Sequence, residues 1–358
     1  MGKPYDIEQI NVMVWLRFPL IMGVVLAHCN LYAIFTNWEG CNPDWPGWLI
    51  YIFSYFYLLL LPARVPTLFI ISGYFFFRSQ KERNIHFFID KYKRRVHSLL
   101  LPYLFWNAIV IMLMYLRYDI ILDNDYSLTD YLSGFWSSTI NDNGLPANNP
   151  LWFMRDLMVV TLLTPVIYGL TKGKYGVLTI FFLAACYVIN IKIPVCGISF
   201  EAILFFSVGA YLAIHNVNIT SIPKYWGIVM LLLYVPIQVF MNGLTSDCKY
   251  LYCFDLLTNC IKITAVLYLV SLLFKRGVLK PTPRLGKMSF LLYALHGIIV
   301  GPIIMLLYIL SGRTDNPLLL LGIYILTPII ILVVAIVLYN VLTKFTPNIA
   351  KVVTGNRR

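Results

Sequence analysis

The sequence predicts an all-α, polytopic integral membrane protein: a helical bundle of about ten transmembrane helices with both the N- and the C-terminus in the cytoplasm. Three observations predict this class. Charged residues make up 12% of the 358 residues, about half the share in soluble domains. Several apolar segments are longer than the roughly 20 residues that cross a bilayer. The predicted loops alternate between strongly basic and weakly basic.

Hydropathy divides the chain into ten apolar spans, and each must be a helix where it faces lipid, because unpaired backbone groups are too costly there. The predicted spans are residues 11–35, 48–77, 97–116, 151–170, 175–191, 199–215, 224–242, 254–274, 288–311 and 317–343. The second span is too long for one straight crossing and contains Pro62 and Pro66. We therefore expect this span to be kinked or broken near these prolines.

The distribution of basic residues sets the orientation. With the N-terminus inside, the cytoplasmic segments hold 20 of the 28 Lys and Arg residues and the outside loops hold four. This asymmetry follows the positive-inside rule and predicts a multi-pass protein of the cell membrane, inner or plasma. It also accounts for the net charge of +12 without nucleic acid as a partner. The basic loops would face anionic membrane lipids or an anionic cytosolic ligand.

Two polar residues stand out in the first predicted helix. Arg17 and His28 are eleven residues apart, which is about three turns, so both side chains lie on the same face, roughly 16 Å apart along the axis. One interpretation is that Arg17 reaches the inner headgroups and His28 hydrogen-bonds a neighbouring helix. The other is that a cation near the cytoplasm and a titratable base deeper in the membrane line one wall.

A second polar stripe lies in the ninth predicted span. Ser289, Tyr293 and His296 follow an i, i+4, i+7 spacing, which places them on one helix face. Such residues can hydrogen-bond neighbouring helices, serve general-base chemistry or carry protons in a transporter. Spacing does not separate these alternatives.

The seven cysteines lack metal-ligand spacing, and we expect no metal. Cys41, Cys196, Cys248 and Cys253 fall in or near outside loops. These four leave room for one disulfide, although unpaired apolar residues are the favoured interpretation.

Several segments, taken together and in order, resemble the membrane acyltransferase 3 family. Arg17 and His28 match its Arg-x10-His signature, and Val65–Phe75 is similar to its Val-Pro-x-Phe-Phe-x-x-Ser-Gly-Tyr/Phe segment. Further agreement comes from three patches: Leu101-Pro102-Tyr103 with Trp106-Asn107, Leu151–Arg155, and Leu285–His296.

The resemblance implies an enzyme that moves an acyl group, usually acetyl, from cytosolic acyl-CoA to a hydroxyl of an extracytoplasmic or lipid-linked carbohydrate. His28 matches the family's essential histidine and Arg17 its paired arginine. Whether His28 acts as the base or relays the acyl group is left open.

The remaining candidate residues fall into two groups. The family's Arg-x-x-Arg pair before the third span is replaced here by Lys93-Arg94-Arg95, which would bind the CoA phosphates or, equally well, lipid headgroups. The residues expected to bind substrate or stabilise an oxyanion are Arg64, Ser72, Arg155, Trp152, Ser289, Tyr293 and His296.

Some relatives carry a soluble domain after the last helix. Here only Lys344–Arg358 follows the last predicted span, so we expect one transmembrane acyltransferase domain, residues 1–358, without an appended soluble domain. The competing hypothesis is a transporter or flippase of a lipid-linked glycan or small anion. The sequence does not distinguish acetyl from succinyl or another acyl group, nor does it identify the acceptor sugar.

Overall fold

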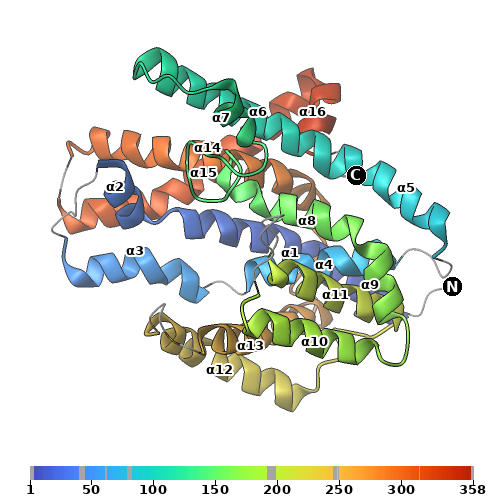
Figure 1. Ribbon diagram of the computed structural model, residues 1–358. Helices are drawn as coiled ribbons and strands as arrows, with labels where there is room; N and C mark the ends of the chain where they lie inside the picture. The colour runs from blue at the N-terminus through green and yellow to red at the C-terminus, as the bar shows by residue number, and fades with distance from the viewer. Residues whose placement is uncertain are drawn as a thin grey trace. The chain divides into compact units, whose positions relative to one another are not determined.

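In a computed structural model of the protein, every regular element among the described residues is a helix (Figure 1). The structure describes residues 4–39, 45–60, 63–78, 83–191, 199–244, 248, 250–313 and 315–355. They form two compact units, unit 1 (Met1–Gly23, Leu58–Tyr92 and Val159–Gly286) and unit 2 (Val24–Tyr57, Lys93–Met158 and Lys287–Arg358). Each unit is described separately below.

Unit 1 contains most of the first helix and the central helices of the chain. Its elements are α1 (Pro4–His28, to Gly23), α4 (Arg64–Phe77), most of α5 (Ile85–Arg95), the end of α8 (Trp152–Leu162), α9 (Thr164–Thr171), α10 (Gly176–Val188), α11 (Phe200–Ile214), α12 (Lys224–Asn242) and α13 (Leu251–Lys275).

Two glycines bring α4 and α11 together in this unit. A Cβ atom on Gly73 would overlap the carbonyl oxygen of Phe206, and one on Gly209 would overlap that of Ile70. Small residues at facing positions allow helix backbones to approach closely in membrane proteins. Gly73, part of the Ser-Gly-Tyr segment, therefore has a packing role.

Unit 2 contains the end of α1 and the C-terminal helices. Its other elements are α2 (Leu31–Glu39), most of α3 (Gly47–Leu60), the end of α5, the π-helical segments Val96–Leu100 and Leu116–Ile121, α6 (Leu101–Tyr115), α7 (Leu128–Ser133), the 3₁₀ turn Asn149–Leu151, most of α8, α14 (Pro283–Leu310), α15 (Pro317–Phe345) and α16 (Pro347–Val353).

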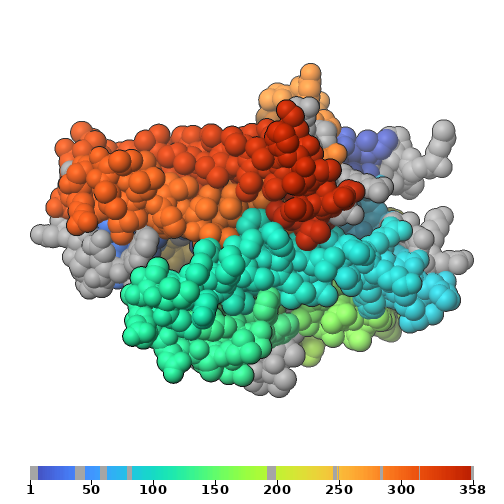
Figure 2. Space-filling view, turned by 90° about the horizontal axis from the view of Figure 1, so that it is seen from above, coloured from blue at the N-terminus to red at the C-terminus, as the bar shows by residue number. Residues whose placement is uncertain are grey.

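The C-terminal helix α16 packs on α6, as the neighbouring red and cyan-green surfaces in Figure 2 show. The indole of Trp106 donates a hydrogen bond to the carbonyl of Val353 (3.1 Å). Pro102 has no N–H to donate to the carbonyl of Ser98 one turn earlier. Gly355, whose φ is +69°, packs its Cα side against that carbonyl, where a Cβ atom would lie 2.8 Å from the oxygen.

Among the described residues, six helices are long and apolar enough to cross a membrane. A seventh candidate is the pair formed by Asn149–Leu162 and α9, which is bent by 62°. Four shorter apolar helices, Gly47–Phe56, α4, α10 and α11, complete the apolar set. The structure thus confirms a helical membrane protein, whereas the number ten and the side of the termini stay predictions.

The boundaries differ from the predicted spans in three places, and one predicted break is confirmed. The first helix ends at His28 rather than continuing to residue 35, because Asn30 caps a new helix by accepting a hydrogen bond from Ala33 N (3.1 Å). The predicted break in span 48–77 is confirmed, with α3 ending at Leu60 and α4 beginning at Arg64; Pro62 lies outside the described residues. The third span extends over Ile85–Ile121, and the fourth is broken at Leu163.

Candidate active site

Two histidines from distant parts of the chain meet in unit 2. His28 is the last residue of α1, and His296 lies in the middle of α14. Their ring centroids are 5.1 Å apart, with the ring planes inclined by 52°. His28 is exposed, whereas His296 is fully buried. The exposed His28 is therefore packed against the buried His296.

The polar stripe predicted on α14 is confirmed as one buried face. Ser289 and Tyr293 are 0% and 4% exposed, and the ring of Tyr293 lies 5.8 Å from that of His296. Neither ring nitrogen of His296 makes a hydrogen bond of good geometry with a described residue. Backbone groups of Tyr293 and Leu292, one turn earlier on α14, interact with this ring through weaker hydrogen bonding.

The loop before α8 is attached to the same helix, beside His296. The hydroxyl of Tyr293 donates to the carbonyl of Pro150, and the side-chain amide of Asn148 donates to the carbonyl of Ala294 (3.1 Å). The loop approaches so closely that a Cβ atom on Gly297 would lie 2.6 Å from Asn148 Oδ1. Residues 148–150 are thus held one turn from the histidine pair.

The patch on α6 that resembles the family connects this loop to the rest of unit 2. Asn107 accepts a hydrogen bond from the backbone N–H of Asn148 (3.0 Å), and its own amide donates to the carbonyl of Tyr103 (3.0 Å). The hydroxyl of Tyr103 donates to the carbonyl of Phe135 (2.6 Å). These side chains position the loop between α6 and α8, residues 122–148, rather than contact the histidines.

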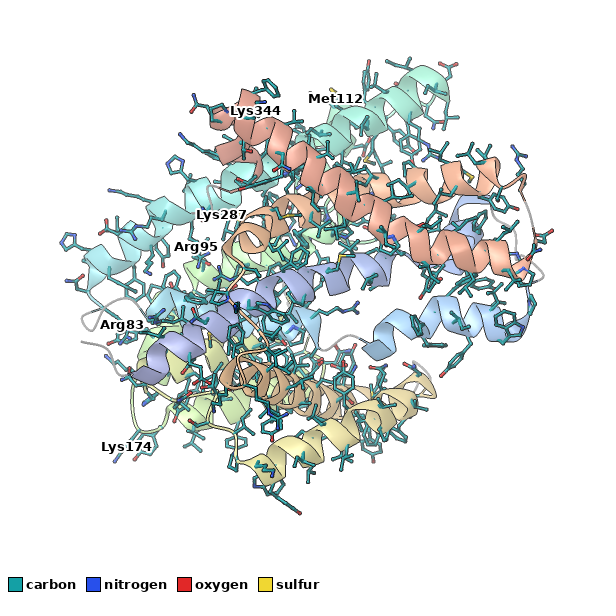
Figure 3. All side chains as sticks on the ribbon, turned by 180° about the vertical axis from the view of Figure 1, so that it is seen from behind. Arg83, Arg95, Met112, Lys174, Lys287 and Lys344 are labelled. Carbon is teal, nitrogen blue, oxygen red and sulfur yellow. The ribbon has the colours of Figure 1, made fainter. Side chains whose placement is uncertain are left out.

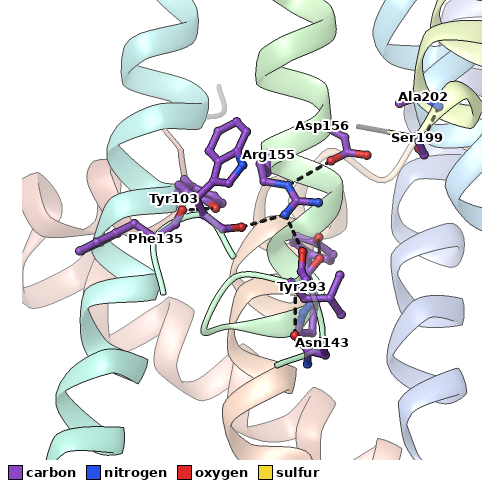
Figure 4. A network of polar contacts seen from close by, with 12 residues as sticks. Tyr103, Phe135, Asn143, Arg155, Asp156, Ser199, Ala202 and Tyr293 are labelled. Carbon is purple, nitrogen blue, oxygen red and sulfur yellow. Dashed lines mark hydrogen bonds and ion pairs between the residues drawn. The ribbon is translucent and has the colours of Figure 1, made fainter. Parts of the chain in front are cut away.

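Arg155 is buried in α8 and is engaged by the same loop (Figure 4). Its Nη1 donates to the carbonyls of Trp136 (2.8 Å) and Gly144 (3.0 Å), and its Nε is 3.3 Å from the carboxylate of Asp156. Arg155 and Asp156 are 3% and 1% exposed. The guanidinium therefore ties the loop to α8, an arrangement that the sequence analysis did not anticipate.

The other predicted residues lie in several places. In unit 1, the guanidinium of Arg17 stacks over the ring of Phe75, 4.6 Å from its centroid. Ser72, on α4 in the same unit, and Trp152, at the start of α8 in unit 2, are partly buried. Arg64 begins α4, where it donates a hydrogen bond through Nη1 to the carbonyl of Gly23 on α1 (2.8 Å).

The predicted donor-binding residues Lys93, Arg94 and Arg95 form the last turn of α5. Lys93 and Arg94 are exposed. Figure 3 shows Arg95 on the same side of unit 2 as Lys287 and Lys344. The basic segment is therefore part of a helix, not the loop implied by the predicted span 97–116, and its charges remain accessible.

The structure describes only two of the four cysteines that left room for a disulfide. Cys248 and Cys253 are free thiols, whereas Cys41 and Cys196 lie outside the described residues. Sequence reasoning missed Asn148 and Gly297 and singled out Asn107 only as part of a motif, because each acts through a loop contact that no helical spacing indicates.

Comparison with known proteins adds the family. A family model described as "Acyltransferase domain" (acyltransferase 3) matches residues 10–339. The chain is also 26% identical to the succinoglycan biosynthesis protein ExoH of Rhizobium meliloti (strain 1021) over 98% of this chain and 92% of that protein. No solved structure matches.

Proposed function

Since this chain belongs to the membrane acyltransferase 3 family, we propose that it is a membrane-bound O-acyltransferase. It transfers an acyl group, most simply acetyl, from cytosolic acyl-CoA to a hydroxyl of an extracytoplasmic or lipid-linked carbohydrate. The carbohydrate is suggested by ExoH, a relative named for the biosynthesis of succinoglycan. The family match spans residues of both units.

The observation that carries the proposal is the pair of His28 and His296. The accessible imidazole of His28 takes the proton from the acceptor hydroxyl, and the resulting oxygen attacks the thioester carbonyl carbon. The carbon–sulfur bond breaks as the ester forms, and the imidazolium of His28 returns the proton to the leaving thiolate. The buried His296, 5.1 Å behind, fixes the orientation of the His28 ring. Acyl relay by His28 uses the same geometry, with the imidazole itself as the first acceptor.

The direction of transfer follows from the predicted topology. With the N-terminus of α1 in the cytoplasm, Arg17 lies on the inner side of His28 and on the same helix face. Phosphate groups of CoA would meet Lys93, Arg94 and Arg95 at the same membrane surface. The pantetheine arm would then follow α1 toward His28, while the carbohydrate enters from outside.

The substitution His28→Ala tests this proposal. We expect it to abolish acyl transfer without affecting membrane insertion, because it removes the only exposed imidazole of the pair. The measurement is mass spectrometry of surface glycans from cells that carry the wild type, the variant or no copy, which also identifies the acyl group. His86→Ala, at another exposed histidine, is the matched control. A wild-type acyl content in cells with His28→Ala contradicts the mechanism.

A second candidate function is a transporter or flippase of a lipid-linked glycan or small anion. The observation that favours it is the break between α3 and α4, since discontinuous helices form substrate sites in transporters. Purified protein in vesicles distinguishes the two: movement of a glycan without consumption of acyl-CoA supports transport, and acyl-CoA consumption coupled to ester formation supports the enzyme.

A further inference from the structure

Unit 1 contains a polar cavity of about 300 Å³, here called the unit 1 cavity. Its polar lining consists of Arg64, Tyr187, Glu201, Gln238, Asp255, Asn259 and Lys262. In an apolar helical unit, so many polar and ionisable groups in one place are costly and indicate a functional site.

Five of the seven polar lining residues lie near one predicted surface of the membrane, whereas Arg64 and Lys262 lie deeper. Tyr187 and Gln238 lie near the C-terminal ends of α10 and α12, helices that are predicted to run outward. Glu201 begins α11, and Asp255 and Asn259 lie in the first turns of α13, helices that are predicted to run inward. The cavity is therefore at the predicted outer ends of four helices.

The formal charges of the cavity cancel. Arg64 and Lys262 supply two cations, and Glu201 and Asp255 supply two carboxylates. An anionic ligand would be repelled by the two carboxylates, and a cationic ligand would be repelled by Arg64 and Lys262. Either repulsion is strong at short range in a medium of low dielectric constant. A neutral ligand that both donates and accepts hydrogen bonds is the better complement.

The polar side chains are already ordered by one another. Asp255 accepts hydrogen bonds from the hydroxyl of Tyr187 and from the amide of Asn259 (2.9 Å). Lys262 donates to the side-chain carbonyl of Gln238. Asn259 and Lys262 are only 8% and 7% exposed, so this arrangement exists before any ligand arrives and reduces the entropic cost of binding.

Arg64 has hydrogen-bond donors that are not used by the described residues. A guanidinium has five N–H groups, and among the described residues this side chain makes one hydrogen bond, to Gly23. It also stands at the N-terminus of α4, where the helix dipole disfavours a cation. An arginine held at such a position, facing a polar cavity, is placed to donate hydrogen bonds to a ligand.

We propose that the unit 1 cavity binds an uncharged sugar residue of the acceptor carbohydrate, with its hydroxyls hydrogen-bonded to Arg64, Asp255, Asn259 and Lys262. The inference rests on the proposed acyltransferase function and adds where the acceptor is held. The cavity volume is at the lower end of the range for small-molecule sites, about 300–1,000 Å³, which suits one sugar residue rather than a long segment of chain. Gly23, the partner of Arg64, lies on the part of α1 that belongs to unit 1.

The test is equilibrium binding by titration calorimetry with the full chain in lipid nanodiscs. The probe is the oligosaccharide repeat unit released from surface polysaccharide of cells that lack this protein. We expect Lys262→Met and Asn259→Leu each to weaken oligosaccharide binding at least tenfold. Acyl-CoA binding and the unfolding temperature should stay at wild-type values in both variants. The matched control is Lys224→Met, at an exposed lysine that begins α12, which should bind the probe like the wild type.

Two variants keep the test decisive if one of them fails to fold. Wild-type oligosaccharide binding by a folded Lys262→Met or Asn259→Leu protein overturns the inference, and so does absence of binding by the wild type. The proposed function fails separately, when surface glycans have the same mass with and without the protein. If the Lys262→Met and Asn259→Leu variants acylate carbohydrate normally, with an unchanged KM for the oligosaccharide, the cavity is not the acceptor site. The proposed enzymatic function is not affected by that result.

Discussion

The close crossing of α4 and α11 gives a quantitative prediction for Gly73→Ala. Apart from its overlap with the carbonyl oxygen of Phe206, the added methyl group would lie 3.0 Å from the carbonyl carbon of Phe206 and 3.1 Å from Ala210 N, where ordinary contact begins at 3.4 Å. Both neighbours are backbone atoms, so no side chain can rotate away and the helices must separate. We expect a loss of stability of about 3 kcal/mol, the upper end of the cost of overpacking.

The reciprocal site makes the prediction sharper. A Cβ atom on Gly209 would lie 2.8 Å from the carbonyl carbon of Ile70 and 2.9 Å from Tyr74 N. Because either substitution separates the same two helices, the second methyl group enters space that the first has already opened. The double variant should therefore lose less stability than the two single losses added together, with a coupling on the order of 1 kcal/mol.

The assay is equilibrium unfolding in detergent micelles, followed by tryptophan fluorescence, for the two single variants and the double variant. Gly322→Ala is the control, since a Cβ atom there meets nothing within 4 Å. Stability of Gly73→Ala within about 0.5 kcal/mol of that control, the usual range of harmless surface substitutions, refutes the close-packing argument. Strict additivity of the two glycine substitutions refutes the shared displacement.

Two further predictions concern the loop between α6 and α8. Arg155→Met should release residues 136–144, because it removes the hydrogen bonds to Trp136 and Gly144 and leaves the buried carboxylate of Asp156 without this cation. Breaking a buried ion pair costs roughly 3–5 kcal/mol of stability, and we expect faster proteolysis of this loop. Unchanged cleavage would show that Arg155 does not hold the loop. Hydrogen bonds from the side chain and backbone of Ser127 and from Thr139 lower the pKa of Asp130 below its ordinary value of 3.8. The stabilisation is therefore complete above the unfolded-state pKa and is lost as the pH falls through the lower folded-state value. Amide-exchange protection of residues 127–139 should decrease on acidification below about pH 4, and Asp130→Asn should remove this dependence, whereas an identical pH profile in the variant contradicts the assignment.

The sequence predicted the parts of the fold that local chemistry decides. Apolar length and charge alternation predicted the helices, and two prolines predicted the break before Arg64, because a proline removes a backbone donor wherever it stands. The end of α1 at His28 was missed, since the capping residue Asn30 is a single polar residue within an apolar run that hydropathy treats as continuous. The break at Leu163 was missed although Pro165 follows it closely, because prolines are tolerated in many membrane helices.

The candidate site was predictable only as a set of separate residues. The spacing of Ser289, Tyr293 and His296 identified one face of α14, but not the partner of that face. The contact of His296 with His28 joins residues 268 positions apart, and it depends on helix packing that single-sequence periodicity does not encode. The role of Arg155 was hidden for a related reason: its partners are backbone carbonyls of a loop, which carry no signature in side-chain type.

The packing of α16 on α6 has a consequence for the purification of the protein. Pro102 has no N–H to donate to the carbonyl of Ser98. Gly355 packs against this carbonyl, and Trp106 donates a hydrogen bond to Val353, so the end of α16 covers this part of the α6 surface. An affinity tag or reporter fused directly after Arg358 would disturb the contacts of α16 with α6. A long flexible spacer, or a tag at the opposite end of the polypeptide, leaves the contacts of α16 with α6 in place.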